Sequence, residues 1–358
     1  MQVGETVRDL GLDGQKEKEG TPTMGGLMIL ISILIPTILF ARLDNIYVLL
    51  LLFATVWFAA IGFLDDRLKI LRKNKDGLRG KYKILGQVFM GLIVALTMLM
   101  HQDIVVRVPA LDAQSMGWEI TKYLDSDLEG GAMVHAKAPI TNVPFLKDNE
   151  LDYSIFVGKN LNLLWLAFIP IVIFIITAVS NAANLTDGLD GLLTGIGAII
   201  GATLAVLAWV SGNAIVADYL NILFIPSSQE IVIYASCFIG ATIGFLWYNS
   251  YPASVFMGDT GSLMIGGVIA VMAVMLRKEI LIPILCGILL VESLSVIMQV
   301  TYFKYTKRRT GTGQRIFLMS PLHHHYQKKG WHEMKIVIRF WILAILLAVL
   351  TIITLKLR

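Results

Sequence analysis

The chain has 358 residues, of which 56% are apolar and only 16% are charged, and its mean hydropathy is +0.70. An average soluble domain carries roughly a quarter charged residues. This composition therefore argues against a soluble enzyme, a disordered protein and a nucleic-acid-binding module. The net charge of +4 says little until the loops that hold the basic residues are known. Cys237 and Cys286 both lie within apolar runs, which argues against a disulfide framework and a cysteine-based metal site.

Nine apolar runs follow a polar N-terminal segment of 24 residues. They lie at about 25–43, 46–64, 84–100, 161–179, 192–210, 230–249, 262–276, 280–302 and 336–355. Each run is near the length that a helix needs to cross a bilayer, whereas barrel strands would be half as long and alternating. The sequence thus predicts an all-α, polytopic membrane helical bundle of about nine transmembrane helices. We expect one integral membrane domain over residues 1–358, with an extended external loop at about 101–160.

The basic residues are distributed unequally between the two sets of loops that nine spans define. One set holds 19 Lys and Arg residues and the other holds nine, and the long segment 101–160 in the poorer set also carries nine acidic residues. The positive-inside rule places the richer set in the cytoplasm, so the N-terminus is expected inside and the C-terminus outside. The richer set comprises residues 1–24, 65–83, 180–191, 250–261 and 303–335.

The unusual polar motifs all fall in this cytoplasmic set or at its membrane edge. A soluble substrate that meets a lipid-embedded one requires such an arrangement. An ion-coupled transporter would instead place its polar residues near the middle of the membrane. The one-sided motifs therefore favour an enzyme over a transporter.

The first two motifs are rich in carboxylates. Asp65 and Asp66 end an apolar run, although a solvated helix end with nearby basic counter-ions explains them equally well. Residues 184–191 hold polar side chains at spacings of three, which a helical turn would align, and glycines that let a ligand approach the backbone. An Asx-type helix cap explains only one of those polar residues well.

Asp259 lies between two glycines just before an apolar run, where it could ligate a cation or cap the next helix. With it, the loops bring five carboxylates to one face of the protein. Oxygen-only ligands suit Mg²⁺, which is usually held by one or two carboxylates plus substrate phosphates. The five carboxylates belong to Asp65, Asp66, Asp187, Asp190 and Asp259.

Three adjacent histidines, His323, His324 and His325, lie in the last cytoplasmic loop. They cannot all face one metal from a regular helix, so we expect them to donate to a phosphate or a sugar. Lys69, Lys81 and Lys83 could help to hold a diphosphate, but simple anchoring at the cytoplasmic face also explains them.

Glu292 and Arg339 are charged residues inside apolar runs of the sequence. Glu292 interrupts one run, and Arg339 lies near the start of the last one. A charge inside a membrane is a functional candidate or else part of a buried pair. Glu292 comes about halfway along its run and could line a cleft.

Five ordered motifs together resemble the polyprenyl-phosphate N-acetylhexosamine-1-phosphate transferases, and within them the branch that transfers phospho-MurNAc-pentapeptide. The resemblance covers most of the chain, and five motifs in order are far more specific than any one of them. The motifs span residues 18–26, 63–66, 184–191, 256–262 and 321–326.

The resemblance implies a reaction and a location. Phospho-MurNAc-pentapeptide would pass from UDP-MurNAc-pentapeptide to undecaprenyl phosphate, releasing UMP and forming lipid I in peptidoglycan synthesis with Mg²⁺ as cofactor. The enzyme would lie in the bacterial inner membrane as a homodimer, with its active site on the cytoplasmic face. The resemblance implies no nucleic-acid partner.

Matched motif by motif, the resemblance also implies roles for single residues. Asp65 and Asp66 match an aspartate pair near the phosphates, with Asp65 deprotonating or orienting the lipid phosphate, and Asp259 holding Mg²⁺. Lys18 would lie beside a uridine pocket formed by Gly188, Leu189, Asp190 and Phe256. The substrate-binding residues implied are Lys18, Thr23, Lys69, Lys81, Asn181, Asn184, Asp187, Gly188, Leu189, Asp190, Asn249, Phe256, His323, His324 and His325.

Two alternatives stay open. A sister transferase would use UDP-GlcNAc, and the triple-histidine loop favours the muramoyl branch over it. The lipid phosphate could attack directly or after an aspartate has attacked covalently, and we favour direct attack because one site can hold both substrates. The family usually has ten spans, and we expect nine because no span precedes Val3.

Overall fold

The computed structural model describes residues 18, 20–72, 77–124, 132–144, 150–158 and 160–356. The first 17 residues, which make up most of the predicted polar N-terminal segment, lie outside this part. Within it, eight helices are long and apolar enough to cross a membrane: α2 (Ile46–Arg72), α3 (Gly80–Met100), α5 (Leu164–Thr186), α6 (Leu192–Gly212), α8 (Gln229–Asn249), α9 (Gly258–Met275), α11 (Gly287–Thr310) and α13 (Glu333–Thr354). A ninth apolar helix, α1 (Gly26–Phe40), is shorter. Eight of the nine predicted runs each correspond to one of these helices, whereas the run 280–302 is divided among η4 (Glu279–Leu281), α10 (Ile282–Leu285) and α11. The predicted polytopic helical bundle is confirmed.

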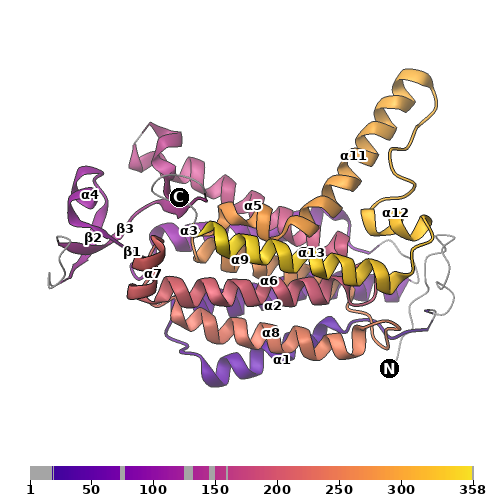
Figure 1. The fold of residues 1–358 in the computed structure, drawn as a ribbon, viewed down its shortest axis with the longest axis horizontal. Helices are drawn as coiled ribbons and strands as arrows, with labels where there is room; N and C mark the ends of the chain where they lie inside the picture. The colour runs from indigo at the N-terminus through magenta and orange to yellow at the C-terminus, as the bar shows by residue number, and fades with distance from the viewer. Residues whose placement is uncertain are drawn as a thin grey trace.

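Most of these helices run alongside one another, and α11 leaves the bundle obliquely (Figure 1). The short strands gather at one end of the bundle, whereas α12 (Leu322–Lys328) lies at the other. Large apolar side chains such as Ile31, Phe174 and Leu346 are exposed on the outer helix surfaces. Such surfaces suit hydrocarbon rather than water, as a multi-pass membrane protein requires.

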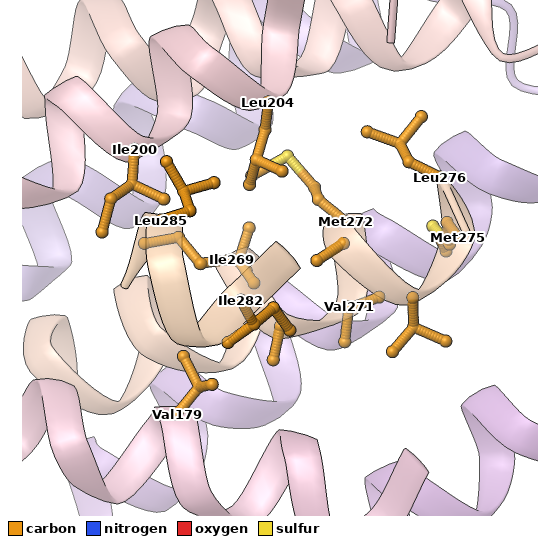
Figure 2. Packing of buried hydrophobic residues seen from close by; sticks show 14 of the residues in the cluster. Val179, Ile200, Leu204, Ile269, Val271, Met272, Met275, Leu276, Ile282 and Leu285 are labelled. Carbon is orange, nitrogen blue, oxygen red and sulfur yellow. The ribbon is translucent and has the colours of Figure 1, made fainter. Parts of the chain in front are cut away.

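Helix α9 lies at the centre of the bundle, with 89% of its residues buried. Figure 2 shows its apolar side chains packed among those of α5, α6 and α10 (Ile282–Leu285). A helix that is apolar on all sides is stable only when it is enclosed. The same enclosure fixes where the first turn of α9 lies, and that turn carries Asp259.

The segment 101–160, predicted as an extended loop, contains two small antiparallel sheets. One has the strand order β1-β3-β2, and the other pairs β4 with β5. Strands of three to five residues are too short to give a clear alternating pattern, which is why the sequence did not indicate them. The strands are β1 (Val106–Pro109), β2 (Glu119–Tyr123), β3 (Met133–Lys137), β4 (Ile140–Asn142) and β5 (Glu150–Asp152).

Backbone and side-chain hydrogen bonds fasten this segment to the bundle. The Asn142 N–H and the Thr141 hydroxyl both donate to the Arg277 carbonyl oxygen, each at 3.0 Å, just beyond α9. Short elements complete the chain near this end: α4 (Ala110–Ser115), η2 (Tyr153–Val157), η3 (Leu161–Leu163), α7 (Ala214–Leu220) and η4 (Glu279–Leu281).

Candidate active site

Three carboxylates from α2 and α9 meet at the end of the bundle opposite the sheets. Asp65, Asp66 and Asp259 each place an oxygen within 4.8 Å of the other two. Gly62 makes this approach possible, because a Cβ at that position would lie 2.2 Å from the Asp259 carbonyl oxygen. Asp65 is fully buried, whereas the Asp259 side chain retains 16% exposure. Asp259 is therefore the most accessible of the three carboxylates.

Asp66 caps the first turn of α9. Its Oδ1 accepts the Asp259 N–H at 3.0 Å, and its Oδ2 accepts the Thr260 N–H at 2.9 Å and the Thr260 hydroxyl at 2.6 Å. Gly258 has a φ of +71°, and a Cβ there would lie 2.7 Å from Asp66 Oδ2. Both oxygens of Asp66 are thus engaged with the helix terminus, where backbone N–H groups need acceptors.

Two lysines bridge the other two carboxylates. Lys69 Nζ lies 2.6 Å from Asp65 Oδ2 and 3.2 Å from Asp259 Oδ2. Lys83 Nζ lies 3.0 Å from Asp65 Oδ1 and 2.5 Å from Asp259 Oδ2. The predicted Lys81 is exposed and lies over the Tyr82 ring instead, with 5.2 Å between Nζ and the centroid. In the first turn of α3, Lys83 rather than Lys81 faces the acids.

The end of α5 supplies amides to the same cluster. Asn184 Nδ2 donates to Asp259 Oδ1 at 3.0 Å and to the Ser262 hydroxyl at 2.9 Å. Asn181 lies one turn deeper and donates to Gln87 Oε1 at 2.8 Å. Gln87 is fully buried and was not predicted as a site residue, although a polar residue within an apolar span is itself a signal.

Residues 187–191 form a turn after α5 that carries a second charged cluster. Asp187 caps α5 with its N–H donated to the Ala183 carbonyl oxygen. Asp190 Oδ1 lies 2.7 Å from Lys18 Nζ, which also lies 2.6 Å from Glu333 Oε1. Glu333 accepts the Asp190 N–H at 2.7 Å. Glu333 was not predicted as a site residue, and its only signal in the sequence is an acid just before the last apolar run.

Three further predicted residues, Asn249, Phe256 and Leu189, lie close to this turn in the structure or the chain. Asn249 Oδ1 accepts the Gly191 N–H at 3.1 Å and the Thr194 hydroxyl at 2.8 Å. Phe256 makes backbone hydrogen bonds to Pro22 and Gly25, which lay the segment that contains Thr23 beside α9. The Leu189 side chain is buried. Asn249 and Leu189 thus hold the turn in place.

The three histidines point in different directions. His323 is fully buried against Glu292 and Gly188. His324 Nδ1 lies 2.7 Å from Gln327 Oε1, and burial followed by the neighbouring His323 lowers the pKa of His324 to about 4. His325 Nδ1 accepts the Leu318 N–H at 3.1 Å. His323 thus packs on the 187–191 turn, and His324 lies beside His323, with 4.2 Å between the ring centroids.

The two charges predicted inside apolar runs, Arg339 and Glu292, have different partners. The Arg339 guanidinium lies 4.4 Å from the centroid of the Trp331 ring, in cation–π geometry. Glu292, by contrast, pairs with His323 inside the protein. Of the two alternatives that the sequence left open for these charges, a buried pair describes Glu292.

The carboxylate cluster has the chemistry of a Mg²⁺ site. Its ligand atoms are all oxygens, and Asp65 and Asp259 remain for a cation because Asp66 serves the helix terminus. Mg²⁺ in enzymes is commonly bound by one or two carboxylates plus substrate phosphates. The residues present therefore fit such an ion.

The fold and the site define a multi-pass membrane protein with a cluster of carboxylates and lysines at one end of its bundle. The family model described as Glycosyl transferase family 4 matches residues 48–277, and phospho-N-acetylmuramoyl-pentapeptide-transferase signature 1 matches residues 18–30. The chain belongs to Glycosyl transferase family 4 and, within it, to the phospho-N-acetylmuramoyl-pentapeptide transferases.

Curated relatives of that name match the whole chain. Those from Flavobacterium psychrophilum and Flavobacterium johnsoniae are 58% and 57% identical to it, and the alignments cover 100% of this chain and 87% of each relative. The relative from Parabacteroides distasonis is 53% identical, with 100% of this chain and 88% of the relative covered. The predicted family is confirmed.

Proposed function

We propose that this protein transfers phospho-MurNAc-pentapeptide from UDP-MurNAc-pentapeptide to undecaprenyl phosphate, which yields lipid I and UMP. The relatives at 53–58% identity carry the name of this activity. The observation that carries the proposal is the meeting of three aspartates and two lysines beside the 187–191 turn. Asn184, at the end of α5, links this cluster to the helix that the 187–191 turn follows.

The main difficulty of the reaction is the charge repulsion between two phosphates, and the cluster has groups that would offset it. Lys69 and Lys83 would offset the charge of the phosphates, and Asn184 would keep the Asp259 carboxylate in place. Mg²⁺, held by Asp259 and Asp65, would supply further charge neutralisation when bound. Asp65 contacts both lysines and the Leu78 N–H, so we assign it to orient these lysines toward the lipid phosphate.

We assign the uridine to the second cluster. Lys18 pairs with Asp190, two residues after Gly188 in the turn, and the Phe256 N–H donates to the Pro22 carbonyl oxygen in the segment that follows Lys18. Lys18 is held by Asp190 and Glu333 and retains 20% exposure, so it can reach a nucleotide. His323 and His324 would contact the sugar-nucleotide from α12.

The proposed location is the bacterial inner membrane, with both clusters at the cytoplasmic face and the small sheets outside. The excess of 19 basic residues over nine supports this orientation. UDP-MurNAc-pentapeptide is soluble and would enter from the cytoplasm, while undecaprenyl phosphate would arrive from the bilayer. We expect the enzyme to work as a homodimer.

Release of UMP tests the proposal. Purified protein is mixed with undecaprenyl phosphate and Mg²⁺, and either UDP-MurNAc-pentapeptide or UDP-GlcNAc is added. We expect UMP only with the muramoyl nucleotide. Release with UDP-GlcNAc alone would assign the protein to the sister branch. If no UMP is released with either nucleotide and the protein carries cations into proteoliposomes, the transporter hypothesis would be favoured.

A further inference from the structure

Glu292 is a fully buried carboxylate in the membrane helix α11, and its partner is one histidine of α12. Glu292 Oε1 accepts the His323 backbone N–H at 3.1 Å, and Glu292 Oε2 lies 3.1 Å from His323 Nδ1. A buried carboxylate is costly unless donors satisfy its oxygens. The two donors of His323 meet this need and hold the imidazole ring in one orientation.

The pairing also determines where the imidazole proton lies. An ionised carboxylate only accepts hydrogen bonds, so the ring nitrogen that faces Glu292 must carry the proton. The other nitrogen, His323 Nε2, is buried and has no hydrogen-bond partner. A proton there would leave a buried donor unsatisfied. The neutral tautomer with Nδ1–H satisfies the pair and leaves Nε2 as a free acceptor.

The free nitrogen faces the turn assigned to the nucleotide. A Cβ at Gly188 would lie 2.2 Å from His323 Nε2 and 2.8 Å from Cε1, so the ring packs directly on this glycine. Gly188 itself is exposed. A buried, unpaired acceptor thus lies against an exposed backbone position in the middle of the 187–191 turn.

We propose that Glu292 is a positioning residue that fixes His323 in the Nδ1–H tautomer, so that Nε2 accepts a hydrogen bond from an N–H or O–H of the nucleotide-sugar. The ligand half of this inference rests on the proposed function. It gives His323 the role of an acceptor, whereas the sequence predicted that the histidines donate. The role of Glu292 is to hold and orient the His323 ring, which is the partner of its carboxylate.

The tautomer can be tested without any activity measurement. Protein labelled with ¹⁵N-histidine is reconstituted in lipid, and the His323 signals are identified from their loss in His323→Gln. We expect a protonated Nδ1 and an unprotonated Nε2. Glu292→Gln keeps the size of the side chain but lets an amide N–H face the ring, and we expect it to move the proton to Nε2. A protonated Nε2 in the wild-type protein would overturn the inference, even if Glu292→Gln does not fold.

A double-mutant cycle tests the link to the substrate. Glu292→Gln and His323→Gln should each lower kcat/KM for UDP-MurNAc-pentapeptide by around tenfold, mainly through KM, because each removes the same substrate hydrogen bond. The double variant should be no more than about twofold worse than either single variant, because the two changes act through one group. Ser295→Ala, which alters a buried hydroxyl one turn along α11, is the matched control and should stay within about twofold of wild type.

Each result separates the two proposals. Additive losses of around a hundredfold in the double variant would show that Glu292 acts independently of His323 and would refute the positioning role. If the wild-type protein transfers nothing from UDP-MurNAc-pentapeptide, the proposed function fails, and the ¹⁵N spectrum still decides the tautomer.

Discussion

Replacing Asp259 by Asn should nearly abolish turnover while the protein still folds. The substitution keeps the shape of the side chain and its contact with Asn184, but it removes the charge that lies between Lys69 and Lys83. Both lysines keep Asp65 as a partner, at 2.6 and 3.0 Å, so the cluster need not come apart. The change therefore tests chemistry rather than folding.

The magnitude follows from what Asp259 supplies. A cation and its charge stabilisation are worth several kcal/mol in the transition state, and a loss of about 4 kcal/mol corresponds to about a thousandfold in kcat. Asp65 remains as a ligand, so the cation should bind more weakly rather than disappear. Loss of a residue that only hydrogen-bonds to a metal ligand typically costs about 10–100-fold in metal affinity. Loss of a direct ligand should cost at least as much.

The assay is UMP release as a function of Mg²⁺ concentration, with thermal unfolding of the same samples as a check on folding. Asp103→Asn is the matched control, because Asp103 is an exposed carboxylate at the opposite end of the bundle, and it should behave like wild type. Near-normal UMP release by folded Asp259→Asn at ordinary Mg²⁺ would refute the assignment of Asp259 as a metal ligand.

Four further outcomes follow from the geometry. Asp66→Ala removes the acceptor for the first turn of α9 and should lower the free energy of unfolding by about 1–2 kcal/mol, as measured by denaturation, whereas no loss would contradict the capping role. Lys83→Ala should reduce kcat by around a hundredfold, and Lys81→Ala should leave it within about twofold, so equal effects would contradict the placement of these lysines. His324→Gln should leave the pH profile of activity unchanged between pH 5 and 8. Its pKa of about 4 keeps His324 neutral over that range, and a lost inflection there would show otherwise. Single cysteines at positions 187 and 324, in a background without Cys237 and Cys286, should resist an impermeant reagent outside intact cells, and one at position 111 should react.

Much of this molecule could be predicted because the bilayer imposes simple rules. The length of the apolar runs predicted the nine apolar helices. The family, now confirmed, was predicted from polar motifs that occur in a fixed order between these runs. Asp65, Asp66 and Asp259 were expected on one face of the protein, and the structure brings them within 4.8 Å.

What the sequence could not predict depends on side-chain direction. Lys81 and Lys83 are two residues apart and so face different sides of α3, and only the packed structure tells which one meets the acids. Likewise, a capping role for Asp66 requires knowing that α9 begins beside α2. Glu333 belongs to the Lys18 cluster through a contact between residues 315 positions apart in the chain. Such distant pairings leave no local pattern.

The fate of the β-phosphorus tests the central claim most directly. UDP-MurNAc-pentapeptide labelled with ³²P at the β-phosphate is incubated with the protein, undecaprenyl phosphate and Mg²⁺, and the lipid and aqueous phases are separated. Transfer of phospho-MurNAc-pentapeptide predicts that the label enters the lipid phase while unlabelled UMP remains in water. Label that stays in the aqueous phase as UDP, with sugar found on the lipid, would mean that the protein transfers the sugar alone and would contradict the account.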